Sequence, residues 1–329
     1  MSRILIIAEI GVNHNGSFEK AKRLINKAKT SGADVVKFQY FKTDNLATKN
    51  LRLTPYQKKN NQYKNQFDML NKLELSEEKI IKLSNYCKKK KIDFSLSFFS
   101  HLDLDIIHKC KIDYLKIPSG EINNYPLLKN IRLFRKKLII STGMSTISEI
   151  NNSIKILKNK NKNITILQCT SSYPAPFEDL NLKNISIFKK KFKLKIGFSD
   201  HTLGNEASIA AVALGAKVIE KHLTLNNDDR GPDHKASLEP DDFKKMVLSI
   251  RNIEKSLGDK KGVMKSERDN FYFVRKKIVA NKKIFKGEKF TLKNIAIKRT
   301  NDKKGIEPNK FNLILNKRSK KNYEKNQAI

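Results

Sequence analysis

Two histidines follow neighbouring apolar runs of the sequence and are candidates for metal chemistry. His201 ends the polar cluster after Ile196–Phe198, and His222 ends the cluster after Lys217–Ile219. Between them, an Ala-rich segment with helical spacing (203–214) predicts a parallel strand–helix–strand unit. Because adjacent parallel strands lie about 4.8 Å apart, the two imidazoles are expected to lie together and share one metal ion. The alternative is that each histidine only caps its strand through local hydrogen bonds.

Lysine and serine residues at other strand ends are suited to binding a phosphate or a carboxylate. Lys37 and Lys116 follow apolar residues within predicted strands, where a buried ammonium group requires a partner. Solvated surface lysines are the alternative in so lysine-rich a chain. The hydroxyl residues expected beside these lysines are Ser119, Ser141, Ser171 and Ser172.

Three glutamates are candidates for proton transfer or for binding hydroxyl groups: Glu9, Glu121 and Glu220. For Glu220, which lies close to His222, holding neighbouring side chains in place is the alternative. His14 is either a structural residue of its loop or a substrate contact. His101 and His108 are interpreted as surface residues of a helix.

These residues lie within a regular alternation of strand and helix patterns. The predicted strands span 4–8, 35–38, 93–97, 114–117, 138–140, 164–167, 196–198 and 217–219. The predicted helices span 17–31, 76–91, 103–110, 126–134, 147–157, 182–191, 203–214 and 241–257. Eight such pairs favour a (β/α)8 TIM barrel, whose chemistry lies at the carboxyl ends of the strands. A doubly wound sheet is disfavoured because no G-x-G-x-x-G motif opens a helix.

Two stretches depart from this alternation. The polar segment from Tyr40 to Glu74 is too long for an ordinary loop and is expected to be functional or disordered. After Gly258 the apolar runs become short, at 271–274, 277–280 and 293–297, with turn residues between them. We predict a catalytic barrel over 1–258, a linker over 259–272 and a small strand-rich domain over 273–329, which is too small to bury much core alone.

Composition limits the possible partners. The net charge of +35 raises the possibility of nucleic-acid binding. However, the lysines are spread along the chain, and it has no Arg-rich tract and no zinc-ligand spacing, so we predict neither nucleic-acid nor membrane binding. The first apolar run is too short for a signal peptide, and no later run approaches a membrane span. Three cysteines without a C-x-x-C pair suit a reducing, cytoplasmic location.

The order of motifs resembles that of the sialic acid synthases, which include N-acetylneuraminate synthase and its relatives for other nonulosonic acids. The matching motifs are AEIGVNHNG, VKFQ, KLELS, KIPSGEINNYPLL, STGM, CTSSYPAPFEDLNL, GFSDHTLG, AVALGAKVIEKHLTL and GPDHKASLEP. The resemblance covers nearly the whole chain, and the C-terminal part resembles an antifreeze-like (SAF) domain.

The resemblance implies condensation of phosphoenolpyruvate with the open-chain aldehyde of an N-acetylated mannosamine-type sugar, with release of phosphate. It further implies that His201 and His222 hold Mn²⁺ or Mg²⁺, which polarises the aldehyde oxygen. Carbon C3 of phosphoenolpyruvate then attacks the aldehyde carbon. Water adds at C2, and C–O cleavage releases phosphate. Glu9 matches a carboxylate that assists proton movement.

The resemblance also assigns the binding residues. The positions that match phosphoenolpyruvate contacts are Lys37, Ser97, Lys116, Ser119, Ser141 and Ser171. The positions that match sugar contacts are Gln39, Glu121, Tyr173 and Asp233. Arg299 matches an arginine that the C-terminal domain delivers to the partner's active site, where it meets the N-acetyl group. The resemblance therefore implies a domain-swapped homodimer.

This chain departs from the usual motifs at three places. It has SFFS over Ser97–Ser100 where relatives commonly have STPFD, Thr300-Asn301 where Pro-Gly usually follows the arginine, and Asn316 where a glycine is common. The GPDHKASLEP motif occurs in both the neuraminate and the legionaminate branches. This motif does not separate the two branches. Our first expectation is an N-acetylneuraminate synthase, with a synthase of legionaminate or another nonulosonate as the alternative. A basic nucleic-acid-binding protein and a catalytically silent sugar-binding barrel are disfavoured.

Overall fold

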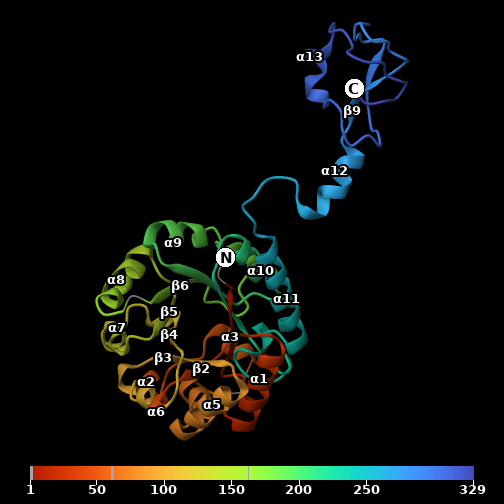
Figure 1. Cartoon of the computed structure of the whole chain (residues 1–329). Coiled ribbons are helices and arrows are strands. Elements are labelled where there is room, and N and C mark those ends of the chain that lie inside the picture. Colours follow the sequence, from red (N-terminus) through yellow and green to blue (C-terminus); the bar gives the residue numbers. More distant parts are fainter. Residues whose placement is uncertain (1–2, 61–62, 162) are drawn as a thin grey trace. The chain divides into compact units, whose positions relative to one another are not determined.

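The computed structural model describes residues 3–60, 63–161 and 163–329. The chain divides into two compact units, Met1–Leu257 and Gly258–Ile329 (Figure 1). The first unit therefore ends one residue before the predicted limit of the catalytic barrel. The predicted linker, 259–272, belongs to the second unit.

Within the described residues of the first unit, eight parallel strands close into a barrel in sequence order. Helices surround this barrel in Figure 1, and the predicted (β/α)8 fold is confirmed. The strands are β1 (Leu5–Gly11), β2 (Val35–Tyr40), β3 (Asp93–Phe98), β4 (Tyr114–Ile117), β5 (Lys137–Ser141), β6 (Ile164–Cys169), β7 (Lys195–Asp200) and β8 (Val218–His222).

The surrounding helices begin where the sequence places side-chain caps. Ser17, Ser76 and Thr146 each accept a hydrogen bond from a backbone N–H in the first turn of their helix. The predicted helix over 103–110 is shorter than expected, because a 3-10 turn at His101–Asp103 precedes it. The helices are α1 (Phe18–Thr30), α5 (Glu77–Lys90), α6 (Ile106–Lys109), α7 (Tyr125–Ile131), α8 (Ile147–Lys158), α9 (Asn184–Phe192), α10 (Glu206–Ala213) and α11 (Pro240–Ser256).

The barrel interior consists of an apolar layer with a polar layer above it. The buried apolar layer contains Ile7, Val35, Ile139, Leu167 and Val218. Two residues further along these strands stand Glu9, Lys37, Ser141, Cys169 and Glu220. Since successive side chains of a strand point to opposite faces, residues two apart point into the same interior. The strand period therefore places the polar groups on an apolar base.

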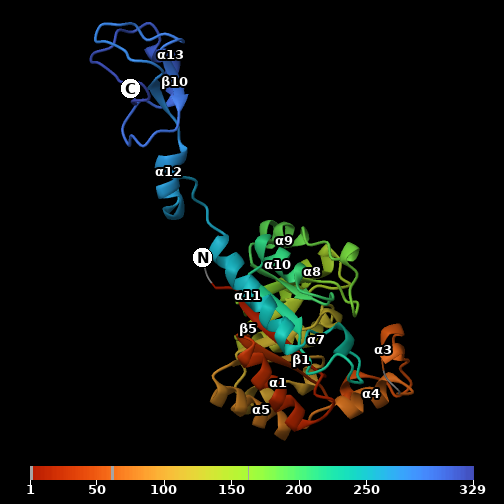
Figure 2. The same ribbon diagram turned by 90° about the vertical axis from the view of Figure 1, so that its right-hand side faces the viewer.

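The long segment after β2 forms three short helices. These are α2 (Thr43–Leu46), α3 (Pro55–Asn60) and α4 (Gln66–Leu73); residues 61 and 62 lie outside the described residues. Val12, Phe41, Leu53, Met69 and Leu73 form a buried cluster that holds the segment on the barrel. In Figure 2, α3 and α4 lie at the end of the barrel away from the N-terminus, where the strands end.

The second unit has its own small core. Strands β9 (Lys277–Ala280) and β10 (Ile295–Lys298) pair antiparallel, and helices α12 (Arg268–Val274) and α13 (Phe311–Ile314) accompany them. The buried cluster contains Ile278, Ala280, Ile284, Phe290, Ile295, Ile314 and Ile329. The short apolar run at 271–274 belongs to α12, which follows a turn at Lys265–Glu267. Its Tyr272, Phe273 and Val274 side chains are exposed.

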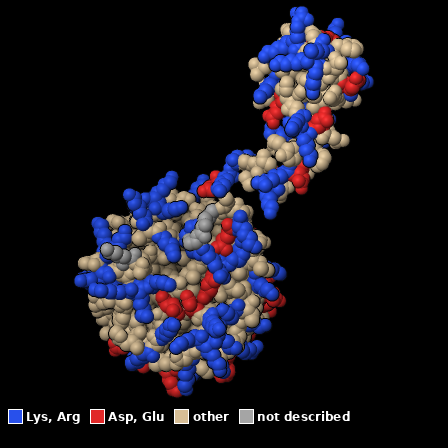
Figure 3. Space-filling view, in the orientation of Figure 1, with Lys and Arg blue, Asp and Glu red and all other residues tan. Residues whose placement is uncertain are grey.

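Positive charge is dispersed over the surface. On the face shown in Figure 3, Lys and Arg side chains are spread over both units, with Asp and Glu side chains among them. None of the helices in the described part of the chain combines the length and the hydrophobicity needed to cross a membrane.

Replacing Gly197 tests the packing inside the barrel. A Cβ atom at this position would lie 2.4 Å from the carbonyl oxygen of Val218 and 2.6 Å from Leu167 Cδ2. Gly197→Ala should therefore lower the free energy of unfolding by about 1–3 kcal/mol, measured by urea denaturation with circular dichroism. Gly258→Ala is the control, because a Cβ atom there has no neighbour within 4 Å. Equal stability of the two variants would contradict the packing shown here.

Candidate active site

A pocket opens where the barrel strands end, and most of the predicted site residues line it. Its lining includes residues from all eight strand ends and from the segment after β2. The predicted members are Glu9, Lys37, Gln39, Ser97, Lys116, Ser119, Ser141, Ser171, Tyr173, His201, Glu220 and His222. The other lining residues are Thr54, Tyr56, Phe99, Pro118, Gly120, Met144 and Ser199.

A buried cluster of charges forms the base of the pocket. Lys116 Nζ donates to both carboxylate oxygens of Glu220 at 2.8 Å, and Lys37 Nζ lies 3.5 Å from Glu220 Oε1. Lys37 Nζ also lies 3.1 Å from Glu9 Oε2. Of the two interpretations of Glu220, the structure favours the one in which it holds neighbouring side chains in place, because its carboxylate lies beside both lysines. The buried lysines are not solvated surface groups.

The charges shift one another's ionisation. Burial raises the pKa of Glu9 to about 7, although the ammonium group of Lys37 acts to lower it. For Glu220, burial also acts to raise the pKa, but Lys116 and Lys37 together hold it below its usual value. Glu220 is therefore ionised at neutral pH, whereas Glu9 can gain or release a proton.

Serine hydroxyls gather beside these lysines at the ends of β4, β5 and β6. Ser119 Oγ accepts a hydrogen bond from the backbone N–H of Gly143 at 3.0 Å. A Cβ atom on Gly143 would lie only 2.3 Å from Ser171 Oγ and 3.0 Å from Ser119 Oγ. The absence of a side chain at Gly143 thus lets two hydroxyl groups approach each other. Hydroxyl and ammonium donors together suit an anionic ligand.

The two candidate metal ligands lie side by side. β7 pairs with β8 through Asp200 and Lys221, so His201 and His222 occupy the next position of each strand. Their ring centroids are 5.5 Å apart. His201 Nδ1 donates to the carbonyl oxygen of Thr170 at 2.8 Å, because a carbonyl oxygen can only accept. This tautomer leaves the lone pair of His201 Nε2 available.

Two observations fit these histidines to a divalent ion. Ser199 Oγ lies 3.4 Å from His201 Nε2, but its proton goes to the Glu220 carboxylate at 3.0 Å, so it does not satisfy the imidazole nitrogen. His222 Nδ1 is buried and has no hydrogen-bond partner among the described residues. Burial, with the adjacent His201, lowers the pKa of His222 well below its usual value, so this imidazole is neutral as a metal ligand must be.

The protein alone supplies few ligands. In the described part of the chain, no three His, Cys, Asp or Glu side chains form a group that could hold a metal ion. Asp233 Oδ2 lies 3.8 Å from His222 Nδ1, beyond hydrogen-bond distance. The remaining coordination positions would therefore belong to water or substrate.

Some of the predicted sugar contacts lie at the pocket and others do not. Gln39 and Tyr173 line the pocket, and Asp233 lies beside His222. Glu121 does not line the pocket; its carboxylate accepts from Asn124 Nδ2 at 2.7 Å. Arg299 is an exposed residue of the second unit.

Sequence reasoning missed the contributions of Thr54, Tyr56, Phe99, Met144 and Ser199 to the pocket lining. For the first two, the unusual length of the segment after β2 was the available signal. Cys169 was also overlooked as a neighbour of His201, with Sγ 3.8 Å from its Nδ1.

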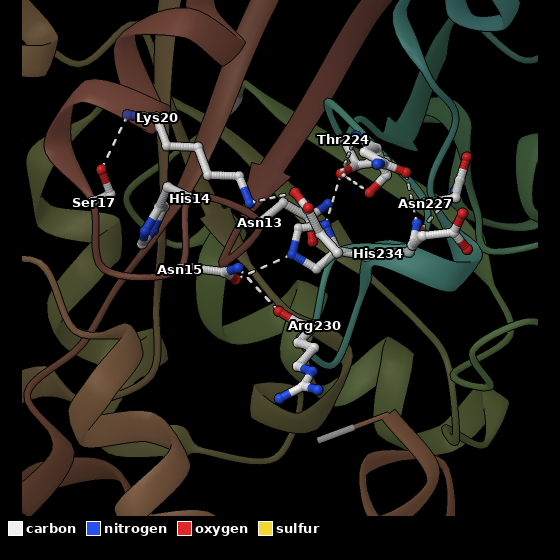
Figure 4. Close-up of polar contacts among 12 residues, drawn as sticks. Asn13, His14, Asn15, Ser17, Lys20, Thr224, Asn227, Arg230 and His234 are labelled. Carbon is white, nitrogen blue, oxygen red and sulfur yellow. Dashed lines mark hydrogen bonds and ion pairs between the residues drawn. The ribbon is translucent and has the colours of Figure 1, made fainter. Parts of the chain in front are cut away.

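A hydrogen-bond network ties the loop after β1 to the loop after β8 (Figure 4). His234 shares a hydrogen bond with Thr224 Oγ1 at 2.7 Å and another with Asn15 Oδ1 at 3.1 Å. Asn13 Nδ2 donates to the Leu223 carbonyl at 3.0 Å. His14 accepts from the Gly16 N–H and stacks on Phe38 inside the barrel wall. His14 is thus a structural residue of its loop, and the network fixes the chain on both sides of Asp233.

Comparison with known proteins identifies the family of this chain. A model of the NeuB family matches residues 24–262. The chain belongs to the NeuB family. Its members generally depend on a metal ion, and this chain is a phosphoenolpyruvate-dependent nonulosonic acid synthase that condenses phosphoenolpyruvate with an amino sugar.

Two relatives and one solved structure illustrate the similarity. N,N'-diacetyllegionaminic acid synthase of Campylobacter jejuni is 46% identical over 100% of this chain and 99% of its own length. The enzyme of the same name from Legionella pneumophila is 40% identical over 95% of this chain and 89% of its own. The structure of N-acetylneuraminic acid synthetase from Leptospira borgpetersenii has a TM-score of 0.73 and 31% identity, covering 82% of this chain and 90% of that one.

Gly143→Ala tests the hydroxyl cluster. The added methyl group should displace the Ser171 hydroxyl, and loss of a hydrogen bond to a charged ligand should raise the KM for phosphoenolpyruvate about tenfold. Steady-state phosphate release measures this effect. Gly120→Ala is a matched control, since it lies at the same pocket but its Cβ atom would have no neighbour within 4 Å. Equal KM values in both variants would exclude this role of Gly143.

The pH dependence of stability tests the burial of His14. Burial lowers the pKa of His14 to about 3, below the usual value of 6.5, so the unfolded chain binds a proton that the folded chain does not. The contribution of His14 is fully present above pH 6.5 and is lost as the pH falls, by about 1.4 kcal/mol per pH unit. The difference in unfolding free energy between wild type and His14→Asn should therefore shrink from pH 7 to pH 5.

Urea denaturation at each pH measures this difference. His108→Asn is the control, because it makes the same replacement at an exposed histidine. A wild-type advantage over His14→Asn that stays constant from pH 7 to pH 5 would show that His14 is not buried in its neutral form.

Proposed function

We propose that this chain condenses phosphoenolpyruvate with the 6-deoxy-4-acetamido analogue of N-acetylmannosamine, giving N,N'-diacetyllegionaminic acid and phosphate. The observation that carries this proposal is the 46% identity, across the whole chain, to the Campylobacter jejuni enzyme of that name. The sialic acid synthetase of known structure is only 31% identical. We therefore prefer the legionaminate branch to N-acetylneuraminate, which was the first expectation from the sequence.

Phosphoenolpyruvate would lie over Lys37 and Lys116, within reach of the serine hydroxyls. Its phosphate and carboxylate groups are anionic, and Glu9 and Glu220 are the carboxylate partners of the buried ammonium groups among the described residues. The ligand would bring additional negative charge to a site where water is largely excluded. We assign its binding to Lys37, Ser97, Lys116, Ser119, Ser141 and Ser171.

The acceptor sugar would lie on the opposite side, against Tyr173 and the histidines. When bound, a divalent ion (Mn²⁺ or Mg²⁺) on His201 and His222 supplies Lewis-acid polarisation of the sugar aldehyde. Carbon C3 of phosphoenolpyruvate forms a bond to the aldehyde carbon, and water adds at C2. The bond from C2 to the phosphate oxygen then breaks, so phosphate leaves and the 2-keto group forms.

Glu9 is placed to move a proton during this sequence. Its pKa of about 7, raised by burial, allows its carboxyl group to accept a proton from the attacking water at neutral pH. Gln39 Nε2 lies 3.4 Å from Glu9 Oε1, which orients the carboxyl group. Gln39, Tyr173 and Asp233 are our candidates for sugar contacts, with Glu121 further from the pocket.

We further propose that Arg299 acts in the site of a partner subunit, within a domain-swapped homodimer. The exposure of Arg299 on the second unit is compatible with such a contact. Gel filtration combined with light scattering tests the dimer. A cytoplasmic location remains a prediction from the cysteine content.

A phosphate-release assay tests the reaction. With phosphoenolpyruvate and Mn²⁺, we expect turnover of the 6-deoxy-4-acetamido sugar to exceed that of N-acetylmannosamine by about tenfold or more in kcat/KM. Mass spectrometry identifies the product. Preference for N-acetylmannosamine would instead establish the neuraminate branch.

His222→Ala tests the metal assignment, and His108→Ala is its matched control. This variant should lose metal-dependent turnover and keep the circular dichroism spectrum of the wild type. His108→Ala, at an exposed histidine, should keep both. Full turnover by His222→Ala would reject the assignment of His222 as a ligand.

A further inference from the structure

We propose that Thr54 and Tyr56 recognise the second acetamido group of the acceptor sugar and so determine which sugar the pocket accepts. This inference rests on the proposed function. Both residues lie on the segment between β2 and α5, and both line the pocket.

A series of contacting aromatic rings leads from the histidines to Tyr56. The ring of Tyr173 lies 4.2 Å from that of His201 and 5.8 Å from that of His222, measured between centroids. The ring of Tyr56 lies 5.3 Å from that of Tyr173, and no ring contact joins Tyr56 to either histidine among the described residues. Tyr56 is therefore one ring further from the histidines than Tyr173.

This order determines which part of the sugar would meet Tyr56. The aldehyde carbon must lie at the histidines and face the phosphoenolpyruvate on the lysine side. In the proposed arrangement, the remaining carbons of the open-chain sugar extend away from the lysines, along Tyr173. The substituents at the far end of the chain, C4 to C6, then reach Thr54 and Tyr56.

The polar atoms at this position suit an amide. Burial, followed by the charge of Asp233, raises the pKa of Tyr56, although Gln57 and Thr54 act to lower it; its hydroxyl is thus protonated at neutral pH. Thr54 Oγ1 is buried beside it but makes no hydrogen bond of good geometry to any described residue. Two hydroxyl groups can serve both the N–H and the carbonyl oxygen of an acetamido group.

The backbone around these residues is held in place before any ligand binds. Gln57 Oε1 accepts a hydrogen bond from the N–H of Thr54 at 3.0 Å, and Gln57 Nε2 donates to the Tyr56 hydroxyl at 3.4 Å. Leu53 is anchored in the apolar cluster beneath the segment. The two hydroxyl groups are therefore preorganised, which reduces the entropic cost of recognition.

Two conservative variants test the proposal. Tyr56→Phe keeps the aromatic stack and removes the hydroxyl, and Thr54→Val keeps the shape of the side chain. Each should lower kcat/KM for the 6-deoxy-4-acetamido sugar about tenfold. The KM for phosphoenolpyruvate should stay unchanged, and kcat/KM for N-acetylmannosamine should fall by less than kcat/KM for the 6-deoxy-4-acetamido sugar. Tyr125→Phe, at an exposed tyrosine outside the pocket, is the control, and thermal denaturation verifies folding.

The outcomes separate this inference from the proposed function. If wild type prefers the diacetamido sugar and both variants keep that preference, the inference alone is overturned. An equal loss with both sugars would also overturn it, since it would show a role in positioning rather than in selection. If wild type turns over only N-acetylmannosamine, the proposed function fails and the acetamido assignment fails with it.

Discussion

The structure of the site depends on the carboxylate of Glu220, which lies between two buried lysines. Lys37 and Lys116 both point into the barrel, where an unpaired ammonium group is costly. Glu220 binds Lys116 at 2.8 Å and lies 3.5 Å from Lys37, so one anion stabilises two cations. Their fields keep Glu220 ionised, and burial leaves the nearby Glu9 with a pKa of about 7. A permanently charged carboxylate and an exchangeable proton thus lie in one small volume.

Strand geometry explains how the barrel supports these charges. The polar layer stands two residues beyond the apolar layer of Ile7, Val35 and Val218. The residues in between point outward and have a different role. The side chains of Asp200 and Lys221 form a fully buried ion pair at 3.0 Å on the outer face of the barrel strands. Their neighbours in the sequence line the pocket; these are Ser199, His201, Glu220 and His222. A polar cluster of three residues at a strand end therefore serves both the active site and the outer wall.

The loops at the ends of the strands complete the pocket above the polar layer. The loop after β8 is fixed by His234 and the two asparagines of the loop after β1 (Figure 4). The segment after β2 brings Tyr56 onto Tyr173. The barrel interior holds the buried lysines and the histidines, whereas the segment after β2 supplies the sugar contacts proposed above. Such a division would allow one chemistry to act on several sugars.

The sequence by itself determined the barrel, the pair of histidines and the two interior lysines, because strand period and strand order follow from local patterns. It left 271–274 unassigned, since a short apolar run has no period that distinguishes a helix from a strand. Only the tertiary structure decided that Glu220 pairs with Lys116 across the barrel and that the ring of Tyr56 contacts that of Tyr173. Such contacts join residues far apart in the chain, and closure of the barrel and packing of the long segment bring them together.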